Sequence, residues 1–568
     1  MKSWPIILGI NSAYHESSAC ILRGSRPLAI AEEERFNRRK HAKPAEVDNP
    51  DEIPAESIRD CLRRAGIRPH QVDYVAYSFD PGLRRPFLEE RTTPGSWGTP
   101  EGEQTFRDHL GRVPRAVGEV LGEDVRNRWI WVAHELCHAA SAYFASPFED
   151  AAVLSVDGIG EYGTGMMAHG HGVKLDVIEE FTYPDSLGFV WEKFAKFIGL
   201  DEYAAPKLMA LAAFARGGRF DADLEVLVRG TGSGFSIDID ELRFRVEDYG
   251  PLEKRFGPRR NPGDRIDFRD AALAASLQKR TEAVLFALAE RLKTITRSSN
   301  FCMAGGVALN CVAMGRLLND GPFERIYVQP LANDAGSALG AALWVAYAHA
   351  GVSERSPMVD PYLASEFDEA SVVAALEHAA VEATRVDHPA AVAAAAIAEG
   401  LIVGWFQGPA EVGPRALGAR SILGDPRRPG TKELINLKVK HREFFRPFAP
   451  AVLEEHAADW FRLDRSSPST RFMSFAVAVH AERRHLVPAI VHVDGTSRVQ
   501  TVSASLNPRF HDLITEFNQR TNVPLVLNTS FNTSDEPIVL SPADALATFL
   551  RTDLDMLVMG NHVVRRGA

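Results

Sequence analysis

Short apolar runs that end in polar turns mark the first strands of the chain. Pro5 to Asn11 is one such run, and Ser18 to Leu22 follows it after a polar turn, which predicts a β-hairpin. The pattern returns at Ala151 to Val156, which ends in an Asp-Gly turn, and at Thr164 to His169. Two hairpins that each open one half of a domain predict a duplicated α/β fold with a nucleotide cleft between the halves.

Helical periodicity appears in three places between and after these strands. Ala55 to Ala65 is amphipathic, a helix is expected to begin near Val132, and Ala271 to Thr296 keeps a helical repeat throughout. By contrast, Pro81 to Gln104 is poorly patterned and is predicted to be a loop.

Two strand-to-helix transitions follow the long helix. Asn300 to Asn310 reads as a strand, a glycine turn and a helix start. Arg325 to Gln329 predicts a strand that leads into Asn333 to Ser337, after which an Ala- and Gly-rich helix can pack closely against the sheet.

A domain boundary is expected in the Pro- and acid-containing interval from Ser353 to Glu369, because its periodicity is weak and a new αβ pattern begins near Ser371. We therefore predict a first domain over residues 1–355 and a second over 356–568. The second domain contains two strands, a motif loop and a basic segment: Leu401 to Phe406, Val523 to Leu527, Gly413 to Asp425, and Lys432 to Arg446.

Composition narrows the class of protein. The 568 residues are 45% hydrophobic and 24% charged, as in ordinary globular proteins. A formal net charge of −11 argues against broad binding to nucleic acid or to an anionic membrane, so any anion site must be local. Five widely spaced cysteines without a Cys-x-x-Cys pair predict buried thiols in a reduced compartment. With no signal-peptide or membrane-spanning pattern, we expect a cytoplasmic protein.

The sharpest local signal is the pair His134 and His138, because histidines at i and i+4 of a helix project from one face and can share a cation. Taken alone, the pair is as readily a packing coincidence. Asp157 at a strand end and Asp334 at a strand-to-helix loop complete a two-His, two-Asp set that suits Fe(II) first, with Mn(II) or Zn(II) as alternatives. The spacing is not that of a zinc protease, and Cys137 is left out of the site.

Glycine loops suggest nucleotide binding beside these carboxylates. Gly305 and Gly306 follow an apolar strand, and Asn310 lies in the next turn, so a phosphate or a nucleotide ring can approach the backbone. A lone Gly-Gly pair is otherwise a simple tight turn. Lys207 is a candidate phosphate contact, with an exposed structural lysine as the alternative.

The second domain carries the stronger anion signal, a group of basic residues interleaved with Gly-Pro, Asp-Pro and Arg-Pro turns. Such turns favour a pocket in which the basic side chains converge on phosphates over an extended nucleic-acid-binding face. Arginine offers bidentate contacts to phosphoryl oxygens. Arg498 and Asn528 add polar groups at expected strand ends. The basic residues are Arg415, Arg420, Arg427, Arg428, Lys432, Lys438, Lys440, Arg442 and Arg446.

His15 lies on the first predicted hairpin and therefore near the proposed cleft. A histidine within hydrogen-bond reach of a hydroxyl can accept its proton as a general base. A structural turn histidine is an equally good interpretation of the sequence.

Together these motifs resemble the antibiotic and nodulation-factor O-carbamoyltransferases, such as the tobramycin, cephamycin and novobiocin carbamoyltransferases, over nearly the whole chain. One departure is at Pro206 to Leu211, where relatives carry a Gly-Lys-x-Met-Gly-Leu element and this chain lacks both glycines. The matching stretches are Leu8 to Asn11, His15 to Ala19, Glu32 to Phe36, His134 to His138, Asp157-Gly158, Gly305 to Asn310, Gly413 to Leu423, Lys440 to Glu443, Arg446 to Pro450, and Leu527 to Asn532.

The resemblance implies an N-terminal actin-like ATPase-class (ASKHA) domain, related to the threonylcarbamoyl transferases, and a YrdC-like C-terminal domain. It implies that carbamoyl phosphate and ATP, with Mg²⁺, form carbamoyl adenylate in the second domain, and that the first moves the carbamoyl group to a hydroxyl of a small natural product such as an aminoglycoside. Iron would lie beside the adenylate, at His134, His138, Asp157 and Asp334. The phosphates and carbamoyl group would be held by Arg415, Arg420, Lys440, Arg442, Arg446, Arg498 and Asn528.

Two other functions share parts of this pattern. A tRNA threonylcarbamoyl-type transferase would use the same first-domain motifs, but the acidic charge counts against a tRNA partner. A nucleotide-dependent interaction module of the actin-like class would use no chemistry. The sequence leaves the acceptor and the oligomeric state open, with a homodimer as one candidate.

Overall fold

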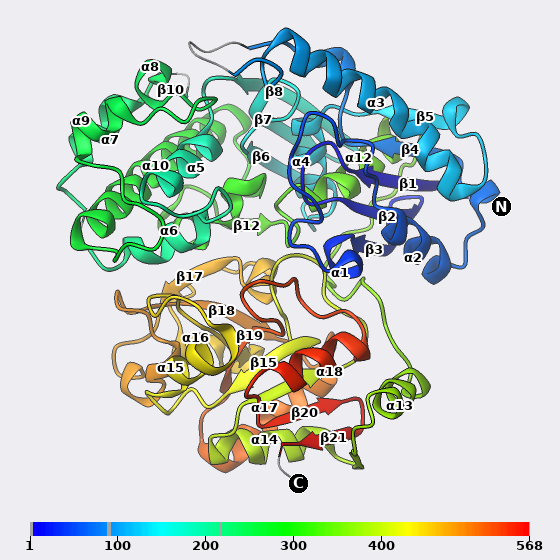
Figure 1. Ribbon diagram of the computed structural model, residues 1–568, viewed down its shortest axis with the longest axis vertical. Coiled ribbons are helices and arrows are strands. Elements are labelled where there is room, and N and C mark those ends of the chain that lie inside the picture. The colour runs from blue at the N-terminus through cyan, green and yellow to red at the C-terminus, as the bar shows by residue number, and fades with distance from the viewer. Residues whose placement is uncertain (1–3, 88–92, 216, 233, 567–568) are drawn as a thin grey trace. The chain divides into compact units, whose positions relative to one another are not determined.

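The structure is a computed structural model that describes residues 4–87, 93–215, 217–232 and 234–566 (Figure 1). The chain divides into two compact units: Met1–Glu33 with Lys43–Val359, and Glu34–Ala42 with Asp360–Ala568. The division between Val359 and Asp360 falls a few residues after the predicted position, and the short segment Glu34–Ala42 in the second unit was not expected.

Two five-stranded sheets with the same topology form the framework of the first unit. Their orders are β3-β2-β1-β4-β5 and β8-β7-β6-β11-β12, with the first three strands antiparallel and the others parallel in each. This repeat agrees with the duplication that the two hairpins predicted. The strands are β1 (Ile6–Asn11), β2 (Ser18–Arg23), β3 (Arg26–Glu32), β4 (Tyr74–Tyr77), β5 (Trp129–Trp131), β6 (Asp150–Val156), β7 (Gly163–His171), β8 (Lys174–Thr182), β11 (Asn300–Ala304) and β12 (Arg325–Val328).

Two buried helices pack on these sheets and on each other. The helix α12 (Ala335–Ala348) lies on β1 and β2, and α4 (His134–Phe144) lies on β6, β7 and β11. Their close approach depends on small residues, since a Cβ at Gly340 would lie 1.8 Å from the Cys137 carbonyl oxygen and one at Gly9 2.1 Å from that of Ala338. The prediction of a closely packed Ala- and Gly-rich helix is thus confirmed.

Further helices cover the outer surfaces of the first unit. The long helix α10 starts at a capping box formed by Asp267 and Asp270. The bounds are α2 (Ala55–Ala65), α3 (Pro100–Leu121), α5 (Leu187–Phe197), α6 (Ala205–Ala212), α7 (Asp221–Leu227), α9 (Gly250–Phe256), α10 (Phe268–Thr296) and α11 (Cys311–Asp320), with the short helix α8 (Ile239–Leu242) and the hairpin β9 (Val228–Gly230) and β10 (Phe235–Ile237). The short helix α1 (Glu34–Asn37) belongs to the second unit.

The loop predicted over Pro81 to Gln104 is wrong at its end. Thr99 caps the first turn of α3 by accepting from the amide of Gly102, so the helix begins at Pro100. Part of the remaining stretch, residues 88–92, lies outside the described residues. Arg84, in the same stretch, is buried, and its guanidinium donates two hydrogen bonds to the Glu103 carboxylate on α3.

The second unit is built on one nine-stranded mixed sheet in the order β13-β21-β20-β14-β15-β19-β16-β18-β17. Its strands are β13 (Thr384–Arg385), β14 (Val403–Phe406), β15 (Arg420–Gly424), β16 (Ala449–Leu453), β17 (Phe475–Ala478), β18 (Thr496–Val502), β19 (Leu525–Ser530), β20 (Met556–Met559) and β21 (His562–Arg565). Its helices are α13 (Glu369–His378), α14 (Pro389–Glu399), α15 (Thr431–Ile435), α16 (Ala457–Trp460), α17 (Pro508–Thr521) and α18 (Pro542–Arg551).

All five cysteines are free and buried, as expected from their spacing. Within the described ranges, no helix is both long and apolar enough to cross a bilayer.

Candidate functional site

The two histidines of the predicted metal site lie on α4, whose first amide is capped by a residue outside the helix, Glu161. The Glu161 carboxylate accepts hydrogen bonds from the His134 amide at 3.0 and 3.1 Å and from the Asp80 amide at 2.6 Å. Burial raises the pKa of Glu161, and the nearby amides and His134 oppose that rise. An acidic group at a helix N-terminus is favourable, and here it fixes the turn that carries His134.

The four predicted metal ligands come together in one buried cluster. The Nε2 atoms of His134 and His138 are 3.1 Å apart. Asp157 Oδ2 lies 3.5 and 3.4 Å from these two nitrogens, and Asp334 Oδ1 lies 3.6 and 3.5 Å from them. One ligand atom from each residue lies within 4.8 Å of the other three. We call these residues the His-Asp cluster.

Neighbouring groups orient the ligand atoms of the His-Asp cluster. The Nδ1 of His134 lies 3.2 Å from the Ser78 carbonyl oxygen, and as a donor there it leaves Nε2 free of its proton and directed at the cluster. The Gly306 amide donates to Asp157 Oδ1 at 2.6 Å, so the other carboxylate oxygen faces the histidines. Such outer contacts are usual around metal ligands.

The charges of the cluster fit a divalent cation. Burial lowers the pKa of His138, but hydrogen bonding to Asp157 and Asp334 outweighs burial and raises the pKa to about 9. The pKa of His134 is likewise raised well above its usual range, chiefly by Asp334 once burial is overcome. The two buried carboxylates therefore require positive charge between them, which either protonated imidazoles or a bound divalent cation can supply.

His15 lies beside the cluster on the loop between β1 and β2. Its Nδ1 is 3.9 Å from Asp334 Oδ2, the oxygen opposite to the one that faces the histidines. The loop is held by Asn11, whose side-chain amide donates to the carbonyls of His15 and Glu16. The His15 ring packs edge-on against Tyr203, and its side chain is 31% exposed, so solvent or a substrate can reach it.

The glycine loop lies against the cluster, and two of the predicted nucleotide contacts, Asn310 and Lys207, also have partners within the protein. Asn310 caps α11 by accepting from the Ala313 amide and also pairs with Gln278, so its side chain serves the local structure. Lys207 on α6 forms an ion pair of 3.2 Å with Asp201.

A Gly305→Ala variant is expected to lower the thermal stability of the protein. Gly305 has φ +88°, and an added Cβ would lie 2.3 Å from the Val156 carbonyl oxygen, so the strain should cost about 1–3 kcal/mol. The matched control is Gly111→Ala on α3, where a Cβ meets nothing within 4 Å, and this change should stabilise by about 0.5–1 kcal/mol. Thermal unfolding of both variants provides the measurement. An unchanged midpoint for Gly305→Ala would show that this position does not require glycine.

In the second unit, three arginines and a lysine are grouped around Arg442, which interacts electrostatically with each of the other three. Burial lowers the pKa of Arg442 to about 9, and Arg446 and Arg498 lower it further by charge repulsion. Burial also places the pKa of Lys440 well below its usual range, with contributions from Arg442, Lys40 and Arg446. The buried Nε of Arg498 has no hydrogen-bond partner among the described residues. We call Lys440, Arg442, Arg446 and Arg498 the cationic cluster; a group of repelling charges of this kind is a candidate anion site.

Lys440 ends a short π-helical turn, Asn436–Lys440, which continues α15. Its ammonium donates to the carbonyl and side-chain oxygens of Asn532, at 2.9 and 2.7 Å, and to Ser530. Asn528, within β19, donates to the Gln500 side chain and to the Ala416 carbonyl. The Asn-Thr-Ser-Phe-Asn motif therefore holds both Lys440 and the loop that carries Arg415, which is half-buried.

The prediction that Arg420 binds phosphate needs correction. Arg420 is fully buried on β15, and its guanidinium donates to the carbonyls of Ser365, Gln407, Gly408, Ala419 and Leu540. The guanidinium also lies 3.7 Å from the centre of the Phe406 ring. Arginine content does not reveal which carbonyls converge on a side chain, so the sequence did not distinguish this structural arginine from its neighbours.

Sequence reasoning missed the carboxylate of Glu411. Glu411 is fully buried, and its Oε1 accepts from the amides of Leu417, Ala419 and Arg420. It thereby folds the Gly413 to Arg420 loop around itself. The available signal was an acidic residue two positions before a Gly-Pro-Arg motif.

Family models match both units. The model described as Carbamoyltransferase N-terminus matches residues 6–343, and the one described as Carbamoyltransferase C-terminus matches residues 394–566. These matches define the protein as an enzyme that transfers carbamoyl groups. The chain belongs to the carbamoyltransferase family.

Curated relatives support this membership. Nodulation protein NolNO of Sinorhizobium fredii is 37% identical over 98% of this chain and 80% of its own length. Nodulation protein NolO of Bradyrhizobium diazoefficiens is 39% identical over 76% of this chain and 78% of its own length. Nodulation protein U of Rhizobium tropici is 29% identical over 93% and 90% of the two chains.

Two solved structures show a distant likeness to this chain. Component A of the (R)-2-hydroxyglutaryl-CoA dehydratase from Acidaminococcus fermentans has a TM-score of 0.35 at 18% identity, covering 61% of this chain and 99% of that one. Full-length HypF in a phosphate- and nucleotide-bound form has a TM-score of 0.32 at 14% identity, covering 62% and 57%. Scores at this level support no conclusion about function.

Proposed function

We propose that the protein is an ATP-dependent O-carbamoyltransferase that makes carbamoyl adenylate in its second unit and uses it in its first. The observation that carries this proposal is the His-Asp cluster with His15 beside it, in a chain of the carbamoyltransferase family. In fold terms we assign the first unit to the actin-like ATPase class, because its two sheets repeat one topology, and the second to the YrdC-like class from the resemblance.

The first step consumes carbamoyl phosphate, ATP and water. Water cleaves carbamoyl phosphate to carbamate and inorganic phosphate. A carbamate oxygen then attacks the α-phosphorus of ATP, the bond to the β-phosphate breaks, and pyrophosphate leaves with its electron pair. The cationic cluster supports this step, because fixed positive groups stabilise the charge that gathers on the phosphoryl oxygens. Mg²⁺ would accompany ATP.

The second step moves the carbamoyl group to an alcohol. His15 accepts the hydroxyl proton, the alcohol oxygen bonds to the carbamoyl carbon, and AMP leaves. Asp334 orients His15 relative to the His-Asp cluster, since one of its carboxylate oxygens belongs to that cluster and the other faces His15. Fe(II), with Mn(II) or Zn(II) as alternatives, would be held by His134, His138, Asp157 and Asp334 and would supply Lewis-acid stabilisation of negative charge.

The acceptor is proposed to be a small-molecule alcohol. It would approach from the side of Tyr203, whose ring packs on His15. The aminoglycoside class, antibiotic biosynthesis and a cytoplasmic location are carried over from the resemblance alone. A net charge of −11 supports partners other than nucleic acid or an anionic membrane.

Mass spectrometry of candidate alcohols tests the proposal. Incubation with the full-length enzyme, ATP and carbamoyl phosphate should add one carbamoyl group to an acceptor, and omission of either co-substrate should prevent the addition. Carbamoylation without ATP would overturn the adenylate route, and modification of bulk tRNA in preference to small alcohols would favour the threonylcarbamoyl-type alternative.

A further inference from the structure

The segment Glu34–Ala42 belongs to the second unit, although the residues on both sides of it, Glu33 and Lys43, belong to the first. We call this segment the strap. Arg38, His41 and Ala42 in the strap have φ values of 59°, 63° and 65°. The left-handed region is unfavourable for residues that carry a Cβ, so contacts of the strap must maintain this conformation.

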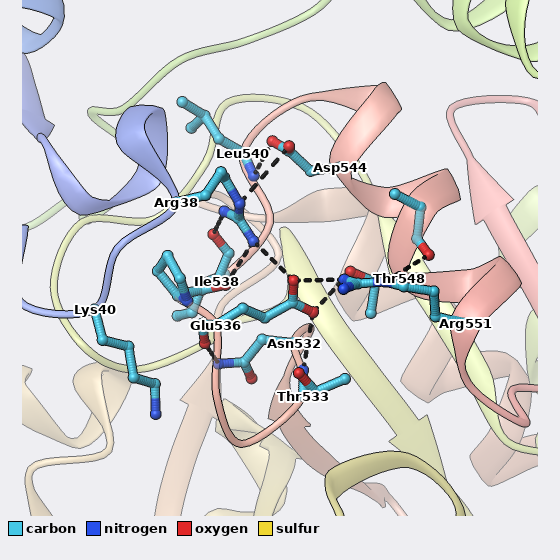
Figure 2. A network of polar contacts seen from close by, with 12 residues as sticks. Arg38, Lys40, Asn532, Thr533, Glu536, Ile538, Leu540, Asp544, Thr548 and Arg551 are labelled. Atoms are coloured by element: carbon cyan, nitrogen blue, oxygen red, sulfur yellow. Dashed lines mark hydrogen bonds and ion pairs between the residues drawn. The ribbon is translucent and has the colours of Figure 1, made fainter.

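Arg38 provides the main contacts between the strap and the loop Asn532–Leu540 (Figure 2). Its guanidinium donates to the Ile538 carbonyl at 2.8 Å and to the Pro537 carbonyl at 2.9 Å. It also lies 3.5 Å from a Glu536 carboxylate oxygen and 3.7 Å from one of Asp544. A planar guanidinium offers five N–H donors in a rigid fork, so it can hold these acceptors in a fixed geometry.

The same loop holds Lys440. The Asn532 side-chain amide donates to the Glu536 carbonyl at 2.7 Å, and its oxygen accepts from the Lys440 ammonium at 2.7 Å. The Glu536 carboxylate in turn accepts from the Thr533 amide and the Thr548 hydroxyl. A continuous chain of hydrogen bonds therefore runs from Arg38 through Glu536 and Asn532 to Lys440.

We propose that Arg38 is a positioning residue for the activation of carbamoyl phosphate, acting through the Asn532–Leu540 loop on Lys440; this inference rests on the function proposed above. Lys440 is repelled by Arg442, by Lys40 of the strap and by Arg446, and the Asn532 oxygens hold its ammonium in place against that repulsion. Without Arg38 the loop loses the contacts to the Pro537 and Ile538 carbonyls and keeps that of Lys40 to the Ser534 carbonyl, so the Asn532 acceptors of Lys440 are held less firmly. Misplacement of such a group by about 1 Å can cost about 100-fold in rate.

The test compares Arg38 with Arg551, which also pairs with Glu536, at 2.7 Å, but is exposed and donates its other hydrogen bond to the Ala547 carbonyl of its own helix. Pyrophosphate release is measured in the full-length enzyme as a function of carbamoyl phosphate concentration. Arg38→Ala should raise KM for carbamoyl phosphate or lower kcat/KM by about 10- to 100-fold. Arg551→Ala should stay within about twofold, as expected for an exposed ion pair, and Arg38→Lys should restore only part of the loss.

Two further measurements separate positioning from general damage. An Arg38→Ala, Lys440→Ala double variant should be no worse than Lys440→Ala, because both changes interrupt the same chain of contacts. Amide hydrogen exchange of Thr533 and Val539 should rise in Arg38→Ala and not in Arg551→Ala. If Arg38→Ala does not fold, Arg38→Lys and Arg551→Lys serve as the matched pair.

Each outcome bears on a different claim. Equal effects of the Arg38 and Arg551 changes, or losses that multiply in the double variant, would overturn the positioning role while leaving the proposed function intact. An unaltered enzyme that releases no pyrophosphate from ATP and carbamoyl phosphate would instead overturn the proposed function.

Discussion

A His138→Ala variant is expected to lose carbamoyl transfer by more than about 100-fold while still releasing pyrophosphate from ATP and carbamoyl phosphate. Loss of outer contacts alone costs metal sites about 10- to 100-fold, and His138 lies within the His-Asp cluster itself. The variant should also bind less metal. Parallel assays of carbamoylated product, pyrophosphate and metal content provide the measurement.

The matched control is His169→Ala, a half-exposed histidine of β7 that pairs with Asp150 outside the cluster. It should keep both activities. Equal loss of pyrophosphate release and carbamoyl transfer in His138→Ala, with the protein folded, would contradict the assignment of the two steps to two units.

An Arg498→Ala variant, unlike His138→Ala, is expected to lose pyrophosphate release itself. The loss should be about 100- to 1,000-fold, as for the removal of one group that stabilises a charged transition state. Arg498 repels Arg442, and its Nε has no partner among the described residues. Removal of this charge should therefore leave the unfolding temperature unchanged or raise it.

Pyrophosphate assays and thermal unfolding of the same preparation check both parts of this expectation. Arg520→Ala, an exposed change on α17 in the same unit, serves as the control. A marked fall in unfolding temperature for Arg498→Ala would show that the arginine supports the structure instead of binding an anion.

The His-Asp cluster could be predicted because its signals are local. The spacing of His134 and His138 within one helix fixes their common face, and the ends of parallel strands bring Asp157 and the Asp334 loop to the same edge. Duplication was likewise visible in two hairpins of similar pattern.

Long-range contacts could not be predicted. Glu161 caps a helix that begins 27 residues before it, and nothing in its neighbourhood marks it as a cap. Arg420 resembles its basic neighbours in the sequence, yet its five acceptor carbonyls come from distant loops as well as from the adjacent residue. The strap was not predicted because nothing in the composition of its nine residues indicates that they belong to the second unit. The residues that Arg38 contacts lie about 500 positions later in the chain.

The nucleotide product tests the central claim most directly. Full-length enzyme supplied with ATP, carbamoyl phosphate and an acceptor should form AMP and pyrophosphate in amounts equal to the carbamoylated product, as the adenylate route requires. Formation of ADP in place of AMP would contradict that route and the separation of the chemistry between the two units.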